Sequence, residues 1–270
     1  MLVDATLPSL AILLVALHAY GVKFVSEFLQ KQQIKKQFGT YLSPAMVDKL
    51  QKNPELLQLG GESRELSIMF TDVRGFTTIT EEYGAQGTVS FLNDYFTMMV
   101  DCITREGGML DKFIGDAIMA CFGLPVAHDD DPDRAARAAI SMIRELWEWN
   151  EERRAQGLKT VDMGIGLNTD MVVSGNIGSP KRMDYTVIGD GVNLASRLES
   201  ACKAYSARIL VSESTVGKLR GTYRLRDIDL VIVNAELCWP QNRVTSVRQN
   251  VGVCNLVADG RITFRIRGLL

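Results

Sequence analysis

Two aspartates stand where strand-like segments end, and their chemistry suits a cation site. Asp72 follows the run 66–71 and opens a turn that contains Gly75, whereas Asp116 precedes the apolar run 117–122. An ionised aspartate only accepts hydrogen bonds. Two such carboxylates brought together can hold a pair of hard cations, and magnesium completes its shell with water and substrate phosphates. The pattern therefore predicts two-metal phosphoryl chemistry.

The turn after Asp72 has two interpretations. Gly75 allows the backbone to turn tightly, and Phe76-Thr77 begins a helix-like stretch. Backbone N–H groups at such a helix start can hold phosphate oxygens. The alternative is an Asx-turn in which Asp72 accepts hydrogen bonds from its own loop. The segment is too short to decide between a phosphate site and a simple turn.

Residues 184–199 predict a helix that begins near Gly191. Asn193 and Arg197 are four residues apart, so an amide and a guanidinium project together from one side of this helix. They are a candidate substrate-binding pair, and a solvated polar face is the alternative. The opposite, apolar side carries Val192, Ala195, Leu198 and Cys202.

Taken together, these motifs resemble those of the class III nucleotide cyclases, the family of adenylate and guanylate cyclases. The resemblance rests on three separated motifs in the order and spacing of the family, and it is closest to bacterial membrane-sensor adenylate cyclases. It extends from about Phe38 to Val233. The matching segments are 70–77, 110–117 and 184–199.

The resemblance implies that the ribose 3′-oxygen of ATP attacks the α-phosphorus, giving 3′,5′-cyclic AMP and pyrophosphate. Asp72 and Asp116 would hold two Mg²⁺ or Mn²⁺ ions, with the Val73 carbonyl assisting. One ion would lower the pKa of the attacking hydroxyl, and the other would neutralise the leaving phosphates. Asn193 would orient the ribose, and Arg197 would stabilise charge on the α-phosphoryl group. The substrate would also contact Gly75, Phe76 and Thr77.

The same resemblance assigns the purine to Lys112 and Thr186. A lysine only donates, which suits the unprotonated ring nitrogen of adenine, and the Thr186 hydroxyl can accept from the neighbouring amino group. Guanine presents a ring N–H instead, so Lys112 would face another donor. Thr186 is less decisive, because a hydroxyl also donates. We therefore expect ATP as the substrate, with guanylate cyclase activity as the lesser alternative.

In this family the active sites lie between two chains, so the resemblance also implies a homodimer. A two-fold interface would create two equivalent sites. One chain would supply the two aspartates to each site, and the other would supply Lys112, Thr186, Asn193 and Arg197.

The elements that must position these residues alternate between strand and helix from Glu65 onward. This order favours an α+β fold, a ferredoxin-like or palm-like sheet with helices packed on it, preceded by an N-terminal apolar helix. The catalytic domain is predicted to span 63–233. Strands are expected at 65–72, 109–114, 117–122, 161–167, 171–174, 184–188, 208–211 and 223–233, and helices at 87–105, from Asp131, at 191–205 and at 213–219.

The N-terminus carries a nearly continuous apolar run over 7–25, which is just long enough to cross a bilayer. The lysines nearby lie at its C-terminal end or beyond it, which the positive-inside rule places in the cytoplasm. We therefore expect a transmembrane helix in 1–26, a helical connector in 27–62 and a cytoplasmic catalytic domain, with no sensor domain upstream. The alternative is a buried or dimer-forming helix, which His18 keeps open.

Bulk composition excludes two other kinds of site. The net charge of −2 and the lack of a clustered Lys/Arg face give no reason to expect nucleic acid as a partner. The five cysteines are scattered without C-x-x-C spacing, which favours reduced thiols over a zinc site.

Residues 234–270 depart from the family pattern and are predicted to form an atypical tail. Such cyclases usually continue with a basic hairpin whose lysine contacts the triphosphate, but no lysine follows Lys218. This departure supports the alternative that the chain is a catalytically weak or inactive, membrane-tethered dimerisation module.

Overall fold

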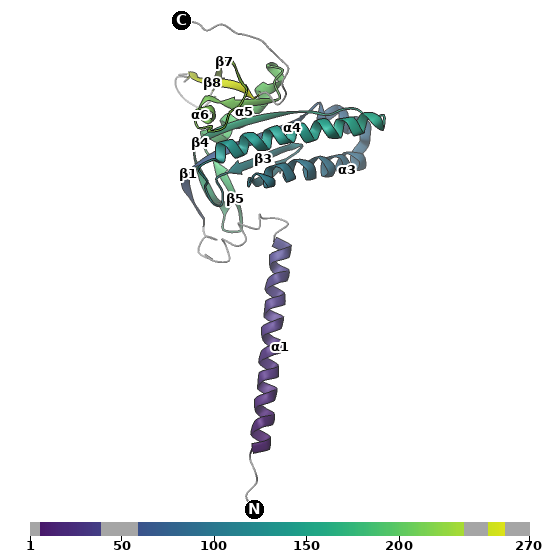
Figure 1. Cartoon of the computed structure of the whole chain (residues 1–270), viewed down its shortest axis with the longest axis vertical. Coiled ribbons are helices and arrows are strands. Elements are labelled where there is room, and N and C mark those ends of the chain that lie inside the picture. The colour runs from purple at the N-terminus through teal and green to yellow at the C-terminus, as the bar shows by residue number, and fades with distance from the viewer. Residues whose placement is uncertain (1–5, 39–58, 235–247, 257–270) are drawn as a thin grey trace, which may run out of the picture. The chain divides into compact units, whose positions relative to one another are not determined.

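The computed structural model describes residues 6–38, 59–234 and 248–256 (Figure 1). The chain divides into two units, Met1–Leu56 and Leu57–Leu270, which we describe separately.

The first unit contains the helix α1 (Thr6–Phe38), which unites the predicted apolar helix and the start of the connector. Polar side chains interrupt its apolar sequence at His18, Lys23 and Glu27, and the last two form an ion pair of 4.0 Å. Within the described ranges, no helix is both long and apolar enough to cross a bilayer. The predicted membrane helix in 1–26 and the single-pass membrane location are therefore wrong. Residues 39–58 of the predicted helical connector lie outside the described residues.

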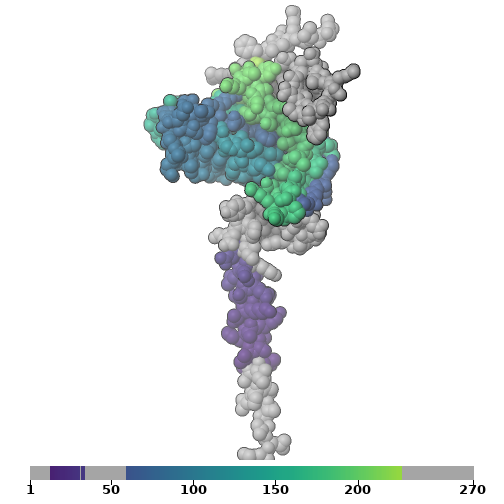
Figure 2. All heavy atoms as spheres, turned by 180° about the vertical axis from the view of Figure 1, so that it is seen from behind, coloured from purple at the N-terminus to yellow at the C-terminus, as the bar shows by residue number. Residues whose placement is uncertain are grey.

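The second unit is built on a mixed sheet in the order β2-β3-β1-β4-β6-β8-β7, with β5 also pairing with β4. Only the β4–β6 pair is parallel among the described strands. Figure 2 shows the start of β1, in blue, beside the green of β4 and β5. The strands are β1 (Gly60–Arg74), β2 (Met109–Ile114), β3 (Ala117–Phe122), β4 (Asp162–Ser179), β5 (Arg182–Ile188), β6 (Ile209–Ser212), β7 (Leu225–Asn234) and β8 (Arg248–Leu256).

Helices cover both faces of this sheet. Alternate residues of a strand face opposite sides, and in β6 Ile209 and Val211 belong to the main core whereas Leu210 packs in a second cluster with Leu198 and Cys202 of α5. The helices α3 and α4 therefore lie on one face and α5 on the other (Figure 1). The helices of this unit are α3 (Phe76–Arg105), α4 (Asp131–Ala155), α5 (Asp190–Ala204) and the short α6 (Glu213–Val216).

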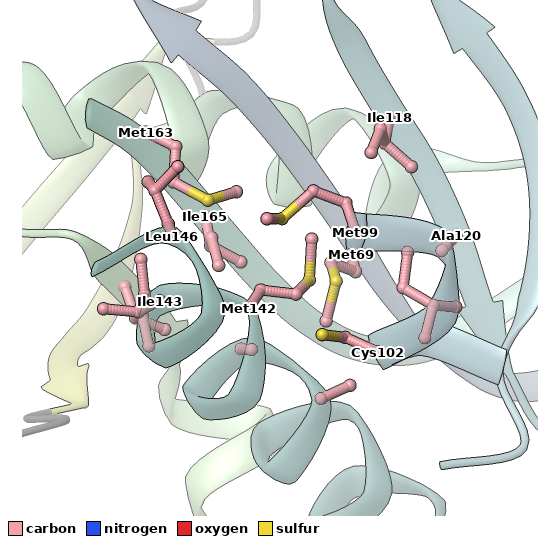
Figure 3. Packing of buried hydrophobic residues seen from close by; sticks show 14 of the residues in the cluster. Met69, Met99, Cys102, Ile118, Ala120, Met142, Ile143, Leu146, Met163 and Ile165 are labelled. Atoms are coloured by element: carbon pink, nitrogen blue, oxygen red, sulfur yellow. The ribbon is translucent and has the colours of Figure 1, made fainter. Parts of the chain in front are cut away.

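The main core is rich in methionine and small residues. Met99 and Cys102 of α3 meet Met142 of α4 and Met69 of β1 in a layer that excludes water (Figure 3). Burial of this apolar surface stabilises the sheet at about 25 cal/mol per Å². The predicted α+β fold with helices packed on a sheet is thus confirmed.

Several predicted boundaries differ from the structure. β1 begins at Gly60 rather than at Glu65, and α3 begins at Phe76 rather than at Gly87. The expected strands 161–167 and 171–174 form one strand, β4, because β1 pairs with it without a break from Asp162 to Asn176. The polar residues 168–170 between the two expected strands thus continue the pairing with β1. In addition, β8 lies inside the segment predicted as the atypical tail and pairs with both β6 and β7.

Candidate active site

The structure brings Asp72 and Asp116 together, as the sequence pattern requires. Asp72 lies near the end of β1, and Asp116 lies in the turn between β2 and β3, the strand that pairs with β1. Gly115 has a φ of 66°, a left-handed conformation that favours glycine in this turn. Burial, together with the charge and hydrogen bond of Asp116, raises the pKa of Asp72 to about 6.

These two carboxylates fit a divalent metal pair in their donor chemistry. Both offer hard oxygen ligands, and their mutual repulsion is what a bound cation would relieve. Across the described part of the chain, no cluster of three or more His, Cys, Asp or Glu side chains is arranged to hold an ion. The remaining ligands would therefore come from the Val73 carbonyl, water and substrate phosphates.

A third carboxylate, that of Glu199, lies near this pair but was given no role by the sequence motifs. Burial and, to a smaller extent, the charge of Asp72 raise its pKa to about 7, while Arg74 opposes the shift. The sequence did contain a signal that Glu199 faces the sheet. Glu199 follows the buried Ala195 by four residues and therefore continues the side of α5 that faces the sheet.

Two glycines of β4 allow α5 to lie directly against the sheet backbone. A Cβ added at Gly166 would lie 2.2 Å from the carbonyl oxygen of Ala195, and one at Gly164 would lie 2.7 Å from Glu199 Oε1. Larger residues at either position would push the helix away from β4. Gly164 and Gly166 therefore set the position of α5 relative to Asp72.

A chain of polar side chains holds the start of α5. Asn168 donates from Nδ2 to the Gly191 carbonyl at 2.9 Å and accepts from the Ser214 hydroxyl at 3.0 Å. Ser214 in turn lies 2.9 Å from the Ser212 hydroxyl. These contacts join β4, β6 and α6 to the first turn of α5.

Asn193 and Arg197 are exposed on the side of α5 away from the sheet, as predicted from their spacing. On this chain burial and the charges of the two aspartates raise the pKa of Glu199. The structure therefore places the predicted polar pair at the surface, while the two aspartates lie toward the other side of the same helix.

The predicted base readers lie on two elements that one hydrogen bond connects. Lys112 is half-buried on β2, and Thr186 is half-buried on β5. The Thr186 hydroxyl donates to Asp111 Oδ2 at 2.7 Å. Asp111 belongs to the motif 110–117, but no role was predicted for it from the sequence.

Gly75 ends β1 and begins α3. Its φ of 70° is left-handed, and its carbonyl accepts from the Thr78 N–H at 3.0 Å. The first helical residues are therefore Phe76 and Thr77, whose N–H groups have no partner inside the helix. Since the first turn of α3 carries no acidic side chain, this helix start retains the positive end of its dipole for an anion.

Comparison with known proteins places this geometry in a family. The sequence profile of the adenylate and guanylate cyclase catalytic domain matches residues 61–245. The chain belongs to the class III adenylate and guanylate cyclase family. The resemblance carried by the three motifs is thus confirmed, and residues 61–245 of this cyclase include every predicted site residue.

Both adenylate and guanylate cyclases occur among its relatives. The chain is 42% identical over 182 residues to an adenylate cyclase of Anabaena cylindrica, covering 65% of this chain and 35% of that protein. It is similar to the structure of the adenylyl cyclase CyaB from P. aeruginosa (33% identity, TM-score 0.62, 75% of this chain and 98% of that chain). It is also similar to the guanylyl cyclase Cya2 (34% identity, TM-score 0.61, 73% and 94%). The cyclase thus spans about a third of the length of the Anabaena relative.

Proposed function

We propose that this protein is an adenylate cyclase that converts ATP to 3′,5′-cyclic AMP and pyrophosphate. The observation that carries the proposal is the convergence of the half-buried Asp72 and Asp116 between the end of β1 and the β2–β3 turn, where their repulsion favours a bound cation. Two Mg²⁺ or Mn²⁺ ions bound there would activate the 3′-hydroxyl and neutralise the triphosphate.

The side chains of the protein position the nucleotide for in-line attack. Asn193 orients the ribose, and Arg197 donates to the oxygens of the α-phosphoryl group, where charge builds up in the transition state. The exposed positions of both residues on α5 suit a contact across a dimer interface. The helix start at Gly75, Phe76 and Thr77 supplies backbone N–H groups to the phosphates.

The proposed assembly is a homodimer with two shared sites. In each site one chain supplies Asp72 and Asp116, and the other supplies Lys112, Thr186, Asn193 and Arg197. Large exposed apolar side chains on the β2–β3 hairpin, on β4 and on β5 suit such an interface. They include Phe113, Ile114, Met171, Val173 and Ile188.

Guanylate cyclase activity is a second candidate, favoured by the similarity to Cya2 at 34% identity. Lys112 argues for ATP, because a buried donor would face the ring N–H of guanine at a cost of about 1–3 kcal/mol. A third candidate is an inactive dimer module, favoured by the lack of any lysine after Lys218, where the family's basic hairpin carries one.

One assay separates these candidates. The purified chain is incubated with ATP or GTP and with Mg²⁺ or Mn²⁺ at several protein concentrations, and cyclic nucleotide is measured. We expect cyclic AMP, with specific activity that rises with protein concentration as dimers form. Equal rates with ATP and GTP would contradict the adenylate assignment, and no product under any condition would favour the inactive module.

A further inference from the structure

The carboxylate of Asp111 occupies a special place in β2. The register between β2 and β3 shifts between Leu110 and Lys112, so Asp111 is the extra residue of a β-bulge. A bulge breaks the alternation of side chains along a strand and re-aims the residue it contains. Asp111 thereby reaches Thr186 on β5, a strand that pairs with β4 rather than with β2.

The contact between Asp111 and Thr186 has a defined direction. The Thr186 hydroxyl donates its proton to Asp111 Oδ2 at 2.7 Å. Burial raises the pKa of Asp111, and this hydrogen bond, the charge of Lys112 and the backbone N–H of Val187 oppose that shift because they favour the carboxylate. An ionised carboxylate has no proton to donate and only accepts.

A threonine hydroxyl has one proton and two lone pairs. With its proton directed at Asp111, Thr186 has only lone pairs left for a ligand. The 6-amino group of adenine can donate to them. The 6-carbonyl of guanine would instead place an acceptor against an acceptor, leaving both without a partner. The ambiguity of Thr186 as a base reader is removed by its neighbour.

We propose that Asp111 is a positioning residue that sets the purine preference of this cyclase, by holding the Thr186 hydroxyl as a pure hydrogen-bond acceptor toward the base. This inference rests on the proposed function insofar as Thr186 reads the purine. Asp111 itself touches no substrate atom in this arrangement.

The test measures purine preference by equilibrium binding, because binding does not depend on turnover. The probes are 3′-deoxy-ATP and 3′-deoxy-GTP, which lack the attacking hydroxyl, with Mn²⁺ present. In Asp111→Asn the amide can turn its NH₂ toward Thr186, which frees the hydroxyl proton for guanine. We expect the ratio of the two affinities to fall about tenfold, equivalent to roughly 1.4 kcal/mol.

Three further variants separate a positioning role from a general structural one. Thr186→Val should lose the preference to the same extent, whereas Thr186→Ser keeps the hydroxyl and should retain it. Asp111→Asn added to Thr186→Val should change the ratio no further, because the hydroxyl is already absent. Should Asp111→Asn fail to fold, Asp111→Ser gives the same comparison.

The outcomes distinguish this inference from the proposed function. A wild-type ratio in Asp111→Asn, or equal weakening of both nucleotides, overturns the role of Asp111 even if the protein makes cyclic AMP. A further loss of preference in the Thr186→Val background overturns it as well. Conversely, a protein that makes no cyclic AMP but changes its binding ratio as expected retains the inference and loses the proposed activity.

Discussion

At the residue scale, the site concentrates negative charge that the protein alone does not neutralise. Asp72 and Glu199 are both held with raised pKa values, and each is affected by the charge of its neighbours. Such perturbed carboxylates are a frequent sign of a functional site. A bound cation would relieve this repulsion and would prepare the place for the triphosphate in the proposed reaction.

The pH dependence of stability tests this charge arrangement. Folding raises the pKa of Asp72 from 3.8 to about 6 and that of Glu199 from 4.5 to about 7. The folded state therefore holds more protons than the unfolded state between about pH 4 and 7, so stability falls as the pH rises through this window. We expect Asp72→Asn to be more stable than the wild type above pH 7, as measured by urea unfolding with a chelator.

The control is Asp94→Asn, a substitution on the exposed side of α3. Its stability should depend on pH in the same way as that of the wild type. Added Mn²⁺ should stabilise the wild type more at high pH than at low pH, because it binds the ionised carboxylates. An Asp72→Asn variant that is no more stable than wild type at high pH would contradict the arrangement.

Arg197 offers a direct test of catalysis. Arg197→Ala should lower the turnover of ATP by roughly 10² to 10³, about 3–4 kcal/mol, since one transition-state donor is lost. Lys203→Ala removes another exposed cation from α5 and should leave turnover unchanged. Turnover is measured as cyclic AMP formed at saturating ATP, and a near-wild-type rate in Arg197→Ala would exclude the assigned role.

Residue types and spacing were enough to predict the convergence of Asp72 and Asp116. They were not enough to assign Glu199 or Asp111. Glu199 becomes part of the site only because α5 packs across β4 onto the end of β1, and Asp111 becomes relevant only through a bulge that aims it at β5. The positions of Glu199 and Asp111 both depend on how separate elements are aligned with one another. The alternation of side chains within one element does not reveal that alignment.

At the scale of the element, α5 depends on the lack of side chains beneath it. Gly166→Ala would place a methyl group into the backbone of α5. Overpacking of this kind costs about 1–3 kcal/mol, and we expect that loss of unfolding free energy together with reduced cyclase activity.

The matched control for Gly166→Ala is Gly217→Ala. Gly217 has a φ of −63°, and its added Cβ would lie at an ordinary 3.5 Å from the Glu213 carbonyl oxygen. Both variants are compared by thermal or urea unfolding and by cyclic AMP formation. An unchanged midpoint in Gly166→Ala would mean that α5 can lift from β4 without cost.

Local turn chemistry explains why the β2–β3 hairpin was predicted with its observed limits. Gly107 and Gly115 both have left-handed φ values. Gly107 precedes the first run of strand-forming residues, and Gly115 separates it from the second. The prediction failed for β4, where two strands, 161–167 and 171–174, were expected instead of one. There the long pairing with β1 supplies hydrogen bonds that a local pattern cannot anticipate.

At the scale of the whole molecule, the main prediction is that each active site needs two chains. Asp116→Asn and Arg197→Ala should each be inactive in isolation, yet their mixture should recover activity. A mixed dimer has one site with both defects and one site with none. Random pairing gives half mixed dimers, and therefore about a quarter of wild-type activity.

A mixture of Asp72→Asn with Asp116→Asn is the control, since both defects lie in the same half-site and no intact site can form. Activity is measured after the two variants are unfolded and refolded together. No recovery in the Asp116→Asn and Arg197→Ala mixture would place a complete site within one chain.

The transmembrane helix predicted in 1–26 was wrong for a physical reason. A run of 19 residues with little polar interruption looked like a membrane span, but the helix that contains it also carries His18, Lys23 and Glu27.

The strand order has a consequence for the synthesis of the chain. β7 is made before β8, yet β8 is the partner that joins it to β6 in the described sheet. As the chain leaves the ribosome, β1 to β6 can pair with one another in turn. The backbone of β7 can join this sheet only after its partner, residues 248–256, has been synthesised. The half of the sheet that carries the aspartates can therefore form early, and its far edge is completed last.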